Sequence, residues 1–401
     1  MKLKLFYLST KDIRKNKADP VHIVKSCKEF VHNGFDVVLI TPKTFRNNYK
    51  KKKSDVWDIY GLKKNYFTLI ELPTIILESL GTNFKLIDKL NQIQQFLLFS
   101  IYLTFLKITS KIKRNDVFYS KSYIFSYVLE IFRKLKIIKN LHVFECAIFS
   151  RYQKTHKFIF DNVDYLYISN NYLKDILIKK YSVCENKMSI LGYISQYEDF
   201  KDKMVGITKA RELLNISLSE KIIMYAGKLM PESEEIEYIY QTAKILYQYS
   251  FYIVGINENK RYEYLDKINS RGINNISFIE FQPLTKLFLY LQSADILASY
   301  YPSRNEFYKN QINPAKSTLY MITNRPVIMA DLPSLRELLN DEQVFFVEPD
   351  NVKKLAYTIV YILNHKFESE IKAHKALDYA KENTYRKKYG FISELIRRKN
   401  T

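Results

Sequence analysis

The chain has 401 residues, more than one hydrophobic core of ordinary size accommodates, so two domains of roughly 200 residues are expected. Its composition, 47% hydrophobic and 26% charged, is that of a globular protein and excludes extended disorder. The formal net charge is +21, with Lys50 to Lys53 in a row. This excess predicts attraction to polyanions or to an anionic membrane surface, and compositional drift toward Lys, Ile and Asn explains it equally well.

The first elements in chain order form a βαβ unit. Residues 3–9 are a short apolar run, and Asp19 and Pro20 can cap and open a helix that continues to His32. Gly34 ends that helix, and the apolar segment 36–42 follows as a second strand. This order predicts a parallel, doubly wound sheet. Because the first strand begins almost at Met1, no signal peptide is expected.

The same alternation continues through the first half of the chain. We expect helices at 84–111, 123–135 and 170–181 and strands at 116–119, 142–145 and 165–168. The most apolar run, Phe96 to Leu106, is shorter than the ~20 residues of a spanning helix. It is interpreted either as a buried core helix or as a segment that lies in a membrane interface between flanking lysines.

A second βα series follows a stretch without periodicity. We therefore assign an N-terminal domain to 1–195, a linker to 196–218, a C-terminal domain to 219–372 and a basic C-terminal helix to 373–401. The second domain is expected to contain strands at 222–227, 251–255, 276–281, 294–299, 326–330 and 344–349, with helices ending near 249, 293 and 364. Two such series predict two Rossmann-like domains.

The sequence lacks the motifs of several common enzyme classes. The nine glycines form no GxGxxG or GxxxxGK loop, which removes the main support for a dinucleotide oxidoreductase or a P-loop NTPase. No Asp-x-Asp, HExxH or GxSxG sequence occurs. Cys27, Cys146 and Cys184 are far apart and unpaired in pattern, so we expect neither disulfides nor a zinc site. No nucleic-acid-binding module accompanies the positive charge, so nucleic acid is not an expected partner.

Two segments of the second half carry a family resemblance. IIMYAGKLMP (222–231) and NPAKSTLYMITNRPVIMADLPSLREL (313–338) resemble, in order and spacing, the family-4 class of GT-B glycosyltransferases, and SADILASYYPS (293–303) fits the strand and loop between them. The first βαβ unit and the segment YLYISNNYLKDILIKKY are similar to the first domain of the same enzymes. The resemblance implies an α/β fold of two Rossmann-like doubly wound domains facing a cleft.

The resemblance also implies which residues bind the donor. A nucleoside diphosphate leaving group gains negative charge as the glycosidic bond breaks, and cations or helix N-termini stabilise this charge without a metal. The matching donor-side positions are Lys228, Lys316, Pro333, Ser334, Leu335, Glu337 and Glu306. Each has a plainer interpretation, as a solvated lysine, an ordinary helix start or an exposed loop residue.

Cations of the first domain are candidates for the acceptor or phosphate side. The loop after the first strand reads TKDIRKNK and contains Lys11 and Arg14, which either face the donor phosphates or are solvated. His22, at the start of the next helix, could reach the same place or be structural. No residue is assigned as catalytic, and no metal or other cofactor is expected.

Other positions depart from the family pattern. Leu319 stands where the family has a Glu that holds the ribose hydroxyls, and a Leu side chain cannot accept a hydrogen bond. Ser233 or Glu232 replaces a second phosphate-facing Lys, and a family His would fall near Ala147. Asn324 replaces a Gly, a change that a left-handed turn tolerates.

The expected function is transfer of a sugar from a nucleotide-sugar donor to a glycan or lipid-linked acceptor in surface polysaccharide or glycoconjugate assembly. By resemblance, the reaction is retaining and metal-independent, in the cytoplasm or at the inner face of the cell membrane. The alternative is a catalytically degenerate GT-B domain that binds a glycan, a lipid or a protein. Leu319 and Ser233 favour this alternative, whereas Lys228 and Lys316 favour transfer.

Overall fold

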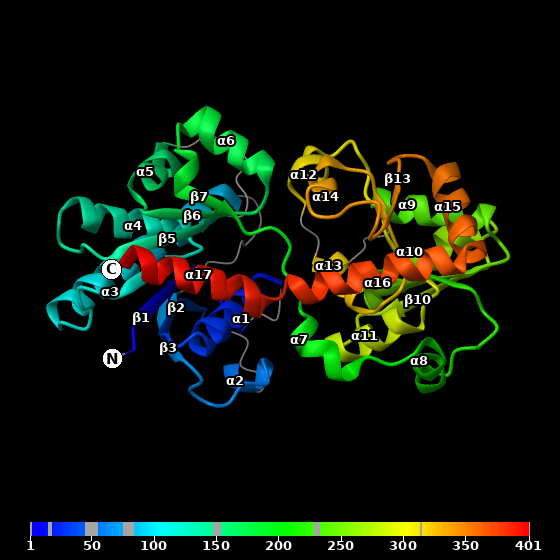
Figure 1. Ribbon diagram of the computed structural model, residues 1–401, viewed down its shortest axis with the longest axis horizontal. Helices are drawn as coiled ribbons and strands as arrows, with labels where there is room; N and C mark the ends of the chain where they lie inside the picture. The colour runs from blue at the N-terminus through cyan, green and yellow to red at the C-terminus, as the bar shows by residue number, and fades with distance from the viewer. Residues whose placement is uncertain are drawn as a thin grey trace. The chain divides into compact units, whose positions relative to one another are not determined.

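The computed structural model describes residues 2–14, 18–44, 55–74, 84–146, 154–227, 233–312 and 315–400. It divides into two compact units (Figure 1). Unit 1 comprises Met1–Leu191 together with Tyr385–Thr401, and unit 2 comprises Gly192–Thr384. The stretch 196–218 lies in unit 2, and residues 373–401 are divided between the units.

Unit 1 is built on a parallel seven-stranded sheet in the order β3-β2-β1-β4-β5-β6-β7. Its strands are β1 (Lys4–Leu8), β2 (Asp36–Thr44), β3 (Thr68–Thr74), β4 (Val117–Ser120), β5 (Leu141–Cys146), β6 (Tyr165–Ile168) and β7 (Met188–Ile190). Its helices are α1 (Ala18–His32), α2 (Val56–Ile59), α3 (Phe84–Ile108), α4 (Tyr123–Lys134), α5 (Lys154–Asn162), α6 (Asn171–Tyr181) and α17 (Tyr385–Asn400). Every residue of β4 and β6 is buried, as expected for strands covered on both faces.

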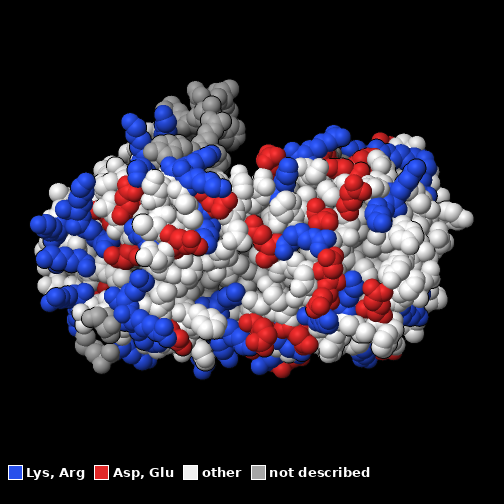
Figure 2. Space-filling view, turned by 45° about the horizontal axis from the view of Figure 1, so that its top comes forward, with Lys and Arg blue, Asp and Glu red and all other residues white. Residues whose placement is uncertain are grey.

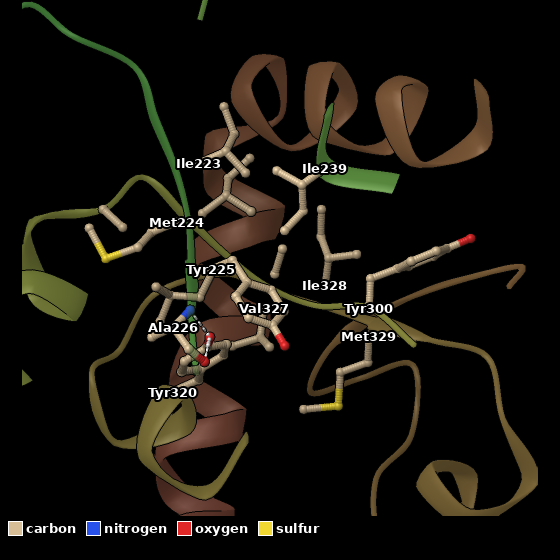
Figure 3. Packing of buried hydrophobic residues seen from close by; sticks show 14 of the residues in the cluster. Ile223, Met224, Tyr225, Ala226, Ile239, Tyr300, Tyr320, Val327, Ile328 and Met329 are labelled. Atoms are coloured by element: carbon tan, nitrogen blue, oxygen red, sulfur yellow. Dashed lines mark hydrogen bonds between the residues drawn. The ribbon is translucent and has the colours of Figure 1, made fainter. Parts of the chain in front are cut away.

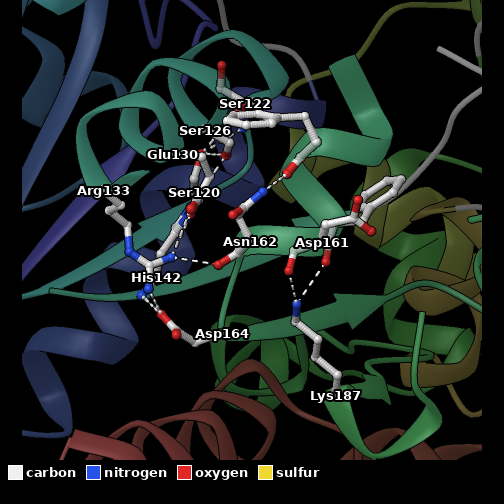
Figure 4. Close-up of polar contacts among 12 residues, drawn as sticks. Ser120, Ser122, Ser126, Glu130, Arg133, His142, Asp161, Asn162, Asp164 and Lys187 are labelled. Carbon is white, nitrogen blue, oxygen red and sulfur yellow. Dashed lines mark hydrogen bonds and ion pairs between the residues drawn. The ribbon is translucent and has the colours of Figure 1, made fainter. Parts of the chain in front are cut away.

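A buried polar network ties α4 to β5 and β6 (Figure 4). Arg133 donates to Glu130 at 2.8 Å and to Asp164 at 2.7 Å, and Asp164 also accepts from the backbone N–H of His142 at 2.7 Å. His142 in turn bonds to Glu130. Each buried charge therefore has an opposite charge or a hydrogen-bond partner, which is the condition under which burial is tolerated, and the network is structural.

Unit 2 is built on a parallel six-stranded sheet in the order β10-β9-β8-β11-β12-β13. Its strands are β8 (Ile222–Ala226), β9 (Ser250–Ile256), β10 (Ile276–Glu280), β11 (Ile296–Ser299), β12 (Val327–Ala330) and β13 (Phe345–Val347). Its helices are α7 (Tyr197–Phe200), α8 (Ile207–Leu214), α9 (Glu234–Ile245), α10 (Arg261–Asn269), α11 (Leu284–Ser293), α12 (Glu306–Gln311), α13 (Ala315–Ile322), α14 (Pro333–Arg336), α15 (Val352–Asn364) and α16 (Lys366–Glu382). The central strands and the helices on both faces share one hydrophobic core (Figure 3).

The two parallel Rossmann-like sheets confirm the predicted fold class. The sequence located β6 and α11 at their observed bounds, and Asn170 caps α6 by accepting from Leu173 N. Sequence analysis missed β3 and β7, which are the two edge strands of unit 1.

The C-terminal basic segment is two helices, not one. Helix α16 ends at Glu382, the carbonyl oxygen of Asn383 accepts from Ser195 N at 2.7 Å, and Thr384 forms a β-bridge with Ser195. The chain then enters α17, which packs on α1 within unit 1. The bridge interrupts the helical hydrogen-bond ladder, and the composition of the segment did not show it.

Candidate functional site

The site in unit 2 lies at the carboxyl end of its sheet, between β8 and β11. The order of the strands reverses there, and ligands of open α/β sheets bind at such points. Strand β8 is followed by Gly227, whose N–H bonds to Val254 O at 2.9 Å. Gly255 follows Val254 with φ +107°, and a Cβ at this position would lie 2.7 Å from Gly227 O. Only glycine therefore allows the two strand ends to approach so closely.

Lys316, at the start of α13, lies beside the carboxyl end of β8. Its Nζ lies 3.9 Å from the ring centroid of Tyr225 on β8 and 4.3 Å from that of Tyr301, which follows β11. The ammonium also donates a hydrogen bond to the Tyr225 hydroxyl. Rings at these distances attract a cation through their quadrupoles. We call Lys316, Tyr225 and Tyr301 the lysine–tyrosine cluster.

Burial among aromatic rings changes the protonation of Lys316. It lowers the pKa of Lys316 to about 7, against the opposing charge of Glu235. The aromatic contacts do not neutralise the ammonium as a carboxylate would. The cluster is therefore a place where an anion can supply the missing countercharge. The phosphate-binding role expected for Lys316 stays a prediction.

Helix α13 is fixed to the end of β8 by Tyr320. The Tyr320 hydroxyl accepts from Ala226 N at 2.7 Å and donates to Ala226 O at 3.1 Å (Figure 3). The preceding residue, Leu319, is 5% exposed and belongs to the hydrophobic core of unit 2. Asn324, after the helix, has φ +56°, so it adopts the left-handed conformation expected at this position.

The other predicted donor-side residues do not join the lysine–tyrosine cluster in any described contact. Ser334 and Leu335 are buried in α14, and the Ser334 hydroxyl donates to Tyr308 O at 2.8 Å. Glu337 is exposed, and Glu306 is exposed at the start of α12, where it accepts from Asn310 at 2.7 Å. Lys228, like Glu232 and Ala147, lies outside the residues that the structure describes.

A polar group that the sequence did not indicate lies beside the same sheet edge. Asp350, with φ +60°, accepts hydrogen bonds from the hydroxyls of Tyr238 and Ser303 and from Ser303 N at 3.2 Å. Burial opposes ionisation, but these hydrogen bonds hold the pKa of Asp350 below its usual value. Asp350 thus fixes the loop after β11 to the start of α15.

A second cluster lies at the corresponding point of unit 1, between β1 and β4, where that sheet reverses its order. Glu145 on β5 accepts from Lys121 Nζ and His22 Nε2, each at 2.9 Å, and from the Tyr119 hydroxyl at 2.7 Å. Lys121 follows β4, and its backbone N–H bonds to Leu8 O at the end of β1. The hydroxyl of Tyr389 on α17 reaches Glu145 at 3.2 Å.

These contacts determine the charge states of the cluster. Burial alone would raise the pKa of Glu145, but Lys121 and His22 hold it well below its usual value. Burial and the charge of Lys121 lower the pKa of His22, so its ring is neutral at pH 7. Because an ionised carboxylate only accepts, His22 Nε2 donates to Glu145 and Nδ1 accepts from the Tyr385 hydroxyl at 2.9 Å.

The three predicted site residues of unit 1, His22, Lys11 and Arg14, lie in different surroundings. His22 is in the Glu145 cluster, whereas Lys11 is exposed and pairs with Asp19 at 3.4 Å. Arg14 forms an ion pair with Glu71 and lines an open cavity of about 470 Å³. Sequence analysis missed Lys121 and Glu145. Their signal was present, because each stands at the carboxyl end of a predicted neighbouring strand.

The described residues contain no evident metal site. Among them, no group of three or more His, Cys, Asp or Glu side chains could hold a metal ion. Within the described helices, none combines the length and apolar character needed to cross a bilayer.

Both units are similar in fold to known proteins. Residues 220–365 match the family model described as glycosyl transferases group 1. Solved structures align over 99% of this chain: sucrose-phosphate synthase from Thermosynechococcus elongatus (13% identity, 99% of that chain, TM-score 0.73), Anabaena Alr3699/HepE in complex with UDP (13%, 100%, 0.69) and the lipopolysaccharide outer core galactosyltransferase WaaB (12%, 100%, 0.63). A search of curated proteins found no significant match. The chain thus has the GT-B fold, and residues 220–365 of unit 2 are similar to the group 1 glycosyltransferases.

Proposed function

We propose that this protein transfers a sugar from a nucleotide-sugar donor to a glycan or lipid-linked acceptor, with retention at the anomeric carbon. The observation that carries the proposal is the lysine–tyrosine cluster at the switch point of unit 2, inside the segment that matches the glycosyltransferase family. Supporting relatives include Alr3699/HepE, which has been solved in complex with UDP and with UDP-glucose.

In the proposed reaction, the bond between the anomeric carbon and the β-phosphate oxygen breaks, and the departing diphosphate keeps the electron pair. An acceptor hydroxyl oxygen forms the new bond to the anomeric carbon and gives its proton to the departing diphosphate. Lys316 would bind the diphosphate and stabilise this growing charge, since a nearby cation strengthens its interaction as the charge develops. Lys228 is proposed to act on the same diphosphate. Ser334, Leu335, Glu337 and Glu306 are proposed to line the remainder of the donor site.

We propose that unit 1 receives the acceptor. The Glu145 cluster provides an ammonium, a neutral imidazole and a carboxylate at the carboxyl end of the sheet, and Lys121 and His22 keep 18% and 16% of their side-chain surface exposed. Polar groups of this kind are suited to hydroxyls and phosphates. Lys11 and Arg14 are proposed to contribute further positive charge on this side.

The alternative is a degenerate domain that binds without catalysis. One observation favours it: Leu319 is buried in the core at the position where the family resemblance predicts a carboxylate for the ribose hydroxyls. A donor bound without this contact would lose a hydrogen bond to a charged group, worth about 1.5–3 kcal/mol. The alternative therefore predicts weak donor binding and no turnover.

Binding and turnover separate the two functions. We would measure thermal stabilisation by a panel of UDP- and GDP-sugars, since a ligand at 100 times its dissociation constant stabilises the folded state by about 2.7 kcal/mol. We would then measure hydrolysis or transfer of the sugar by the amount of nucleoside diphosphate that is released. Stabilisation with release supports transfer. Stabilisation without release of the diphosphate, even when cell extract is supplied as a source of acceptors, supports the degenerate domain. If neither stabilisation nor release is seen, the proposed donor site is contradicted.

A further inference from the structure

Helix α3 is apolar on two opposite faces. The residues that face the core of unit 1 are Phe99, Leu103 and Leu106, each at most 2% exposed, and they recur with helical spacing. A surface helix of a globular protein ordinarily pairs such a face with a polar one. In α3 the face opposite the core is apolar instead.

The outer face carries a continuous row of large aliphatic and aromatic side chains. Its members recur every three or four residues and are 43–76% exposed: Leu90, Ile93, Leu97, Ile101, Phe105 and Ile108. This spacing places them on one side of the helix, about 27 Å long at 1.5 Å per residue. We call this row the outer stripe. Contiguous apolar surface of this kind marks an interaction site.

Positive charge surrounds the end of the outer stripe. Lys107, Lys111, Lys113 and Arg114 are exposed at and after the end of α3, and no acidic residue occurs between Lys89 and Asn115. The end of α4 adds the exposed Lys134, and the loop after it adds the exposed Lys136 and Lys139. Asn140 joins these two basic segments by donating to Lys113 O at 2.7 Å and to Arg114 O at 3.2 Å.

The loop after α4 also exposes apolar side chains. Leu135 is 64% and Ile137 is 39% exposed, between the lysines of the loop after α4. Figure 2 shows blue side chains gathered at the left end of the view, where Figure 1 draws α3 and α4. Apolar residues and lysines are therefore interleaved on one surface of unit 1, made by α3 and the two basic segments.

We propose that this surface binds an anionic lipid bilayer, with the outer stripe lying in the interface and the surrounding lysines on the acidic headgroups. A helix lies in an interface when one face is apolar and cations flank it, and anionic lipids strengthen the binding. Helix α3 lies on the bilayer and does not cross it, because its other face is buried in the core of unit 1. The inference goes beyond sugar transfer and does not depend on it.

Charge decides between a bilayer and a second copy of the chain. Two copies that paired through the outer stripe would bring their own basic segments together, which like-charge repulsion opposes. A bilayer of acidic lipids supplies the opposite charge over the whole area. The bilayer is therefore the occupant that suits both the apolar and the basic part of the surface.

Vesicle cosedimentation tests the proposal with the full chain and no sugar nucleotide. Wild-type protein should sediment with phosphatidylglycerol–phosphatidylcholine vesicles and much less with phosphatidylcholine alone. Polar substitution of the stripe should weaken binding about tenfold or more, because the substituted side chains no longer enter the interface. This variant carries Ile93→Gln, Leu97→Gln and Ile101→Gln. Charge removal by Lys111→Gln, Lys113→Gln and Lys136→Gln should produce a comparable loss.

Matched controls make the result specific. One control replaces three exposed apolar residues of unit 2 with Gln: Leu213, Leu218 and Phe281. The other replaces three exposed lysines of unit 2 with Gln: Lys209, Lys244 and Lys353. Both control variants should bind vesicles as the wild type does. Fluorescence of Trp57, the single tryptophan, reports whether unit 1 remains folded. Equal binding to neutral vesicles, equal losses in the controls, or a lipid-free dimer that the stripe variant dissociates would each overturn the proposal.

Discussion

The switch points of the two sheets both hold a lysine, but its surroundings differ. Lys121 in unit 1 lies 2.9 Å from a carboxylate oxygen of Glu145, whereas Lys316 in unit 2 lies between two tyrosine rings. The carboxylate pairs the charge of Lys121 within the protein. The rings attract the ammonium of Lys316 without neutralising it, and its pKa falls to about 7. One site is electrostatically complete without a ligand, and the other gains most from an anion.

The largest expected effect is on the internally paired site. Glu145→Leu removes the carboxylate that Lys121, His22 and Tyr119 share, and loss of one partner of a buried ion pair typically destabilises by ~3–5 kcal/mol. Urea unfolding followed by Trp57 fluorescence measures this in unit 1. The control is Glu394→Leu, which removes an exposed carboxylate paired with Arg398 at 3.9 Å and should change stability by less than ~1 kcal/mol. Equal effects would refute the difference in pairing.

The next effect concerns the core beneath the lysine–tyrosine cluster. Leu319→Glu places an unpaired carboxylate in the apolar core of unit 2, and we expect a loss of roughly 3 kcal/mol with no gain in nucleotide-sugar affinity. Leu319→Met keeps the volume and should cost less than ~1.5 kcal/mol. Hydrogen exchange of peptides from α13 and calorimetric titration with UDP-glucose measure the two quantities. Tighter binding by the Glu variant would show that the position opens to the donor.

Lys316 itself should show opposite effects on stability and on binding. Lys316→Met removes a charge that is only partly compensated, so we expect a more stable ligand-free protein, by about 1 kcal/mol. Affinity for UDP should fall about tenfold or more, because the variant has no cation to meet the diphosphate. Lys316→Arg should retain binding. A stable Met variant with unchanged UDP affinity would remove Lys316 from the donor site.

The smallest effect is a pH dependence. The free protein loses the proton of Lys316 as pH rises through about 7, whereas bound diphosphate favours the protonated form. Binding then requires proton uptake, so affinity for UDP-glucose should fall as pH rises through 7, by at most about tenfold between pH 6 and 8. Titration calorimetry between pH 6 and 9 tests this. The Lys316→Arg variant should bind independently of pH in this range, and a flat profile for the wild type would exclude proton uptake by Lys316.

The sequence predicted the central strands better than the edges. Strands such as β6 are hydrophobic throughout because both faces are covered. In contrast, most of β3 is exposed or half-buried, and β7 has only three residues. The family resemblance located Lys316, but not the rings of Tyr225 and Tyr301 around it. Those contacts join residues that are 91 positions apart in the case of Tyr225, and no local pattern encodes them. The link from His22 to Glu145 spans 123 positions and was missed for the same reason.

The return of the chain to unit 1 has a consequence for its synthesis. Helix α17 buries Tyr389, Ile392 and Ile396, and Tyr389 contacts both Ser26 and Glu145, so residues translated after unit 2 complete the core of the first unit. Unit 2, in contrast, is continuous from Gly192 to Thr384. As the chain leaves the ribosome, the second unit can therefore reach its final contacts before the first. Until α17 emerges, Glu145 and the surface of α1 lack this cover, so unit 1 can complete its core only after the whole of unit 2 has been synthesised.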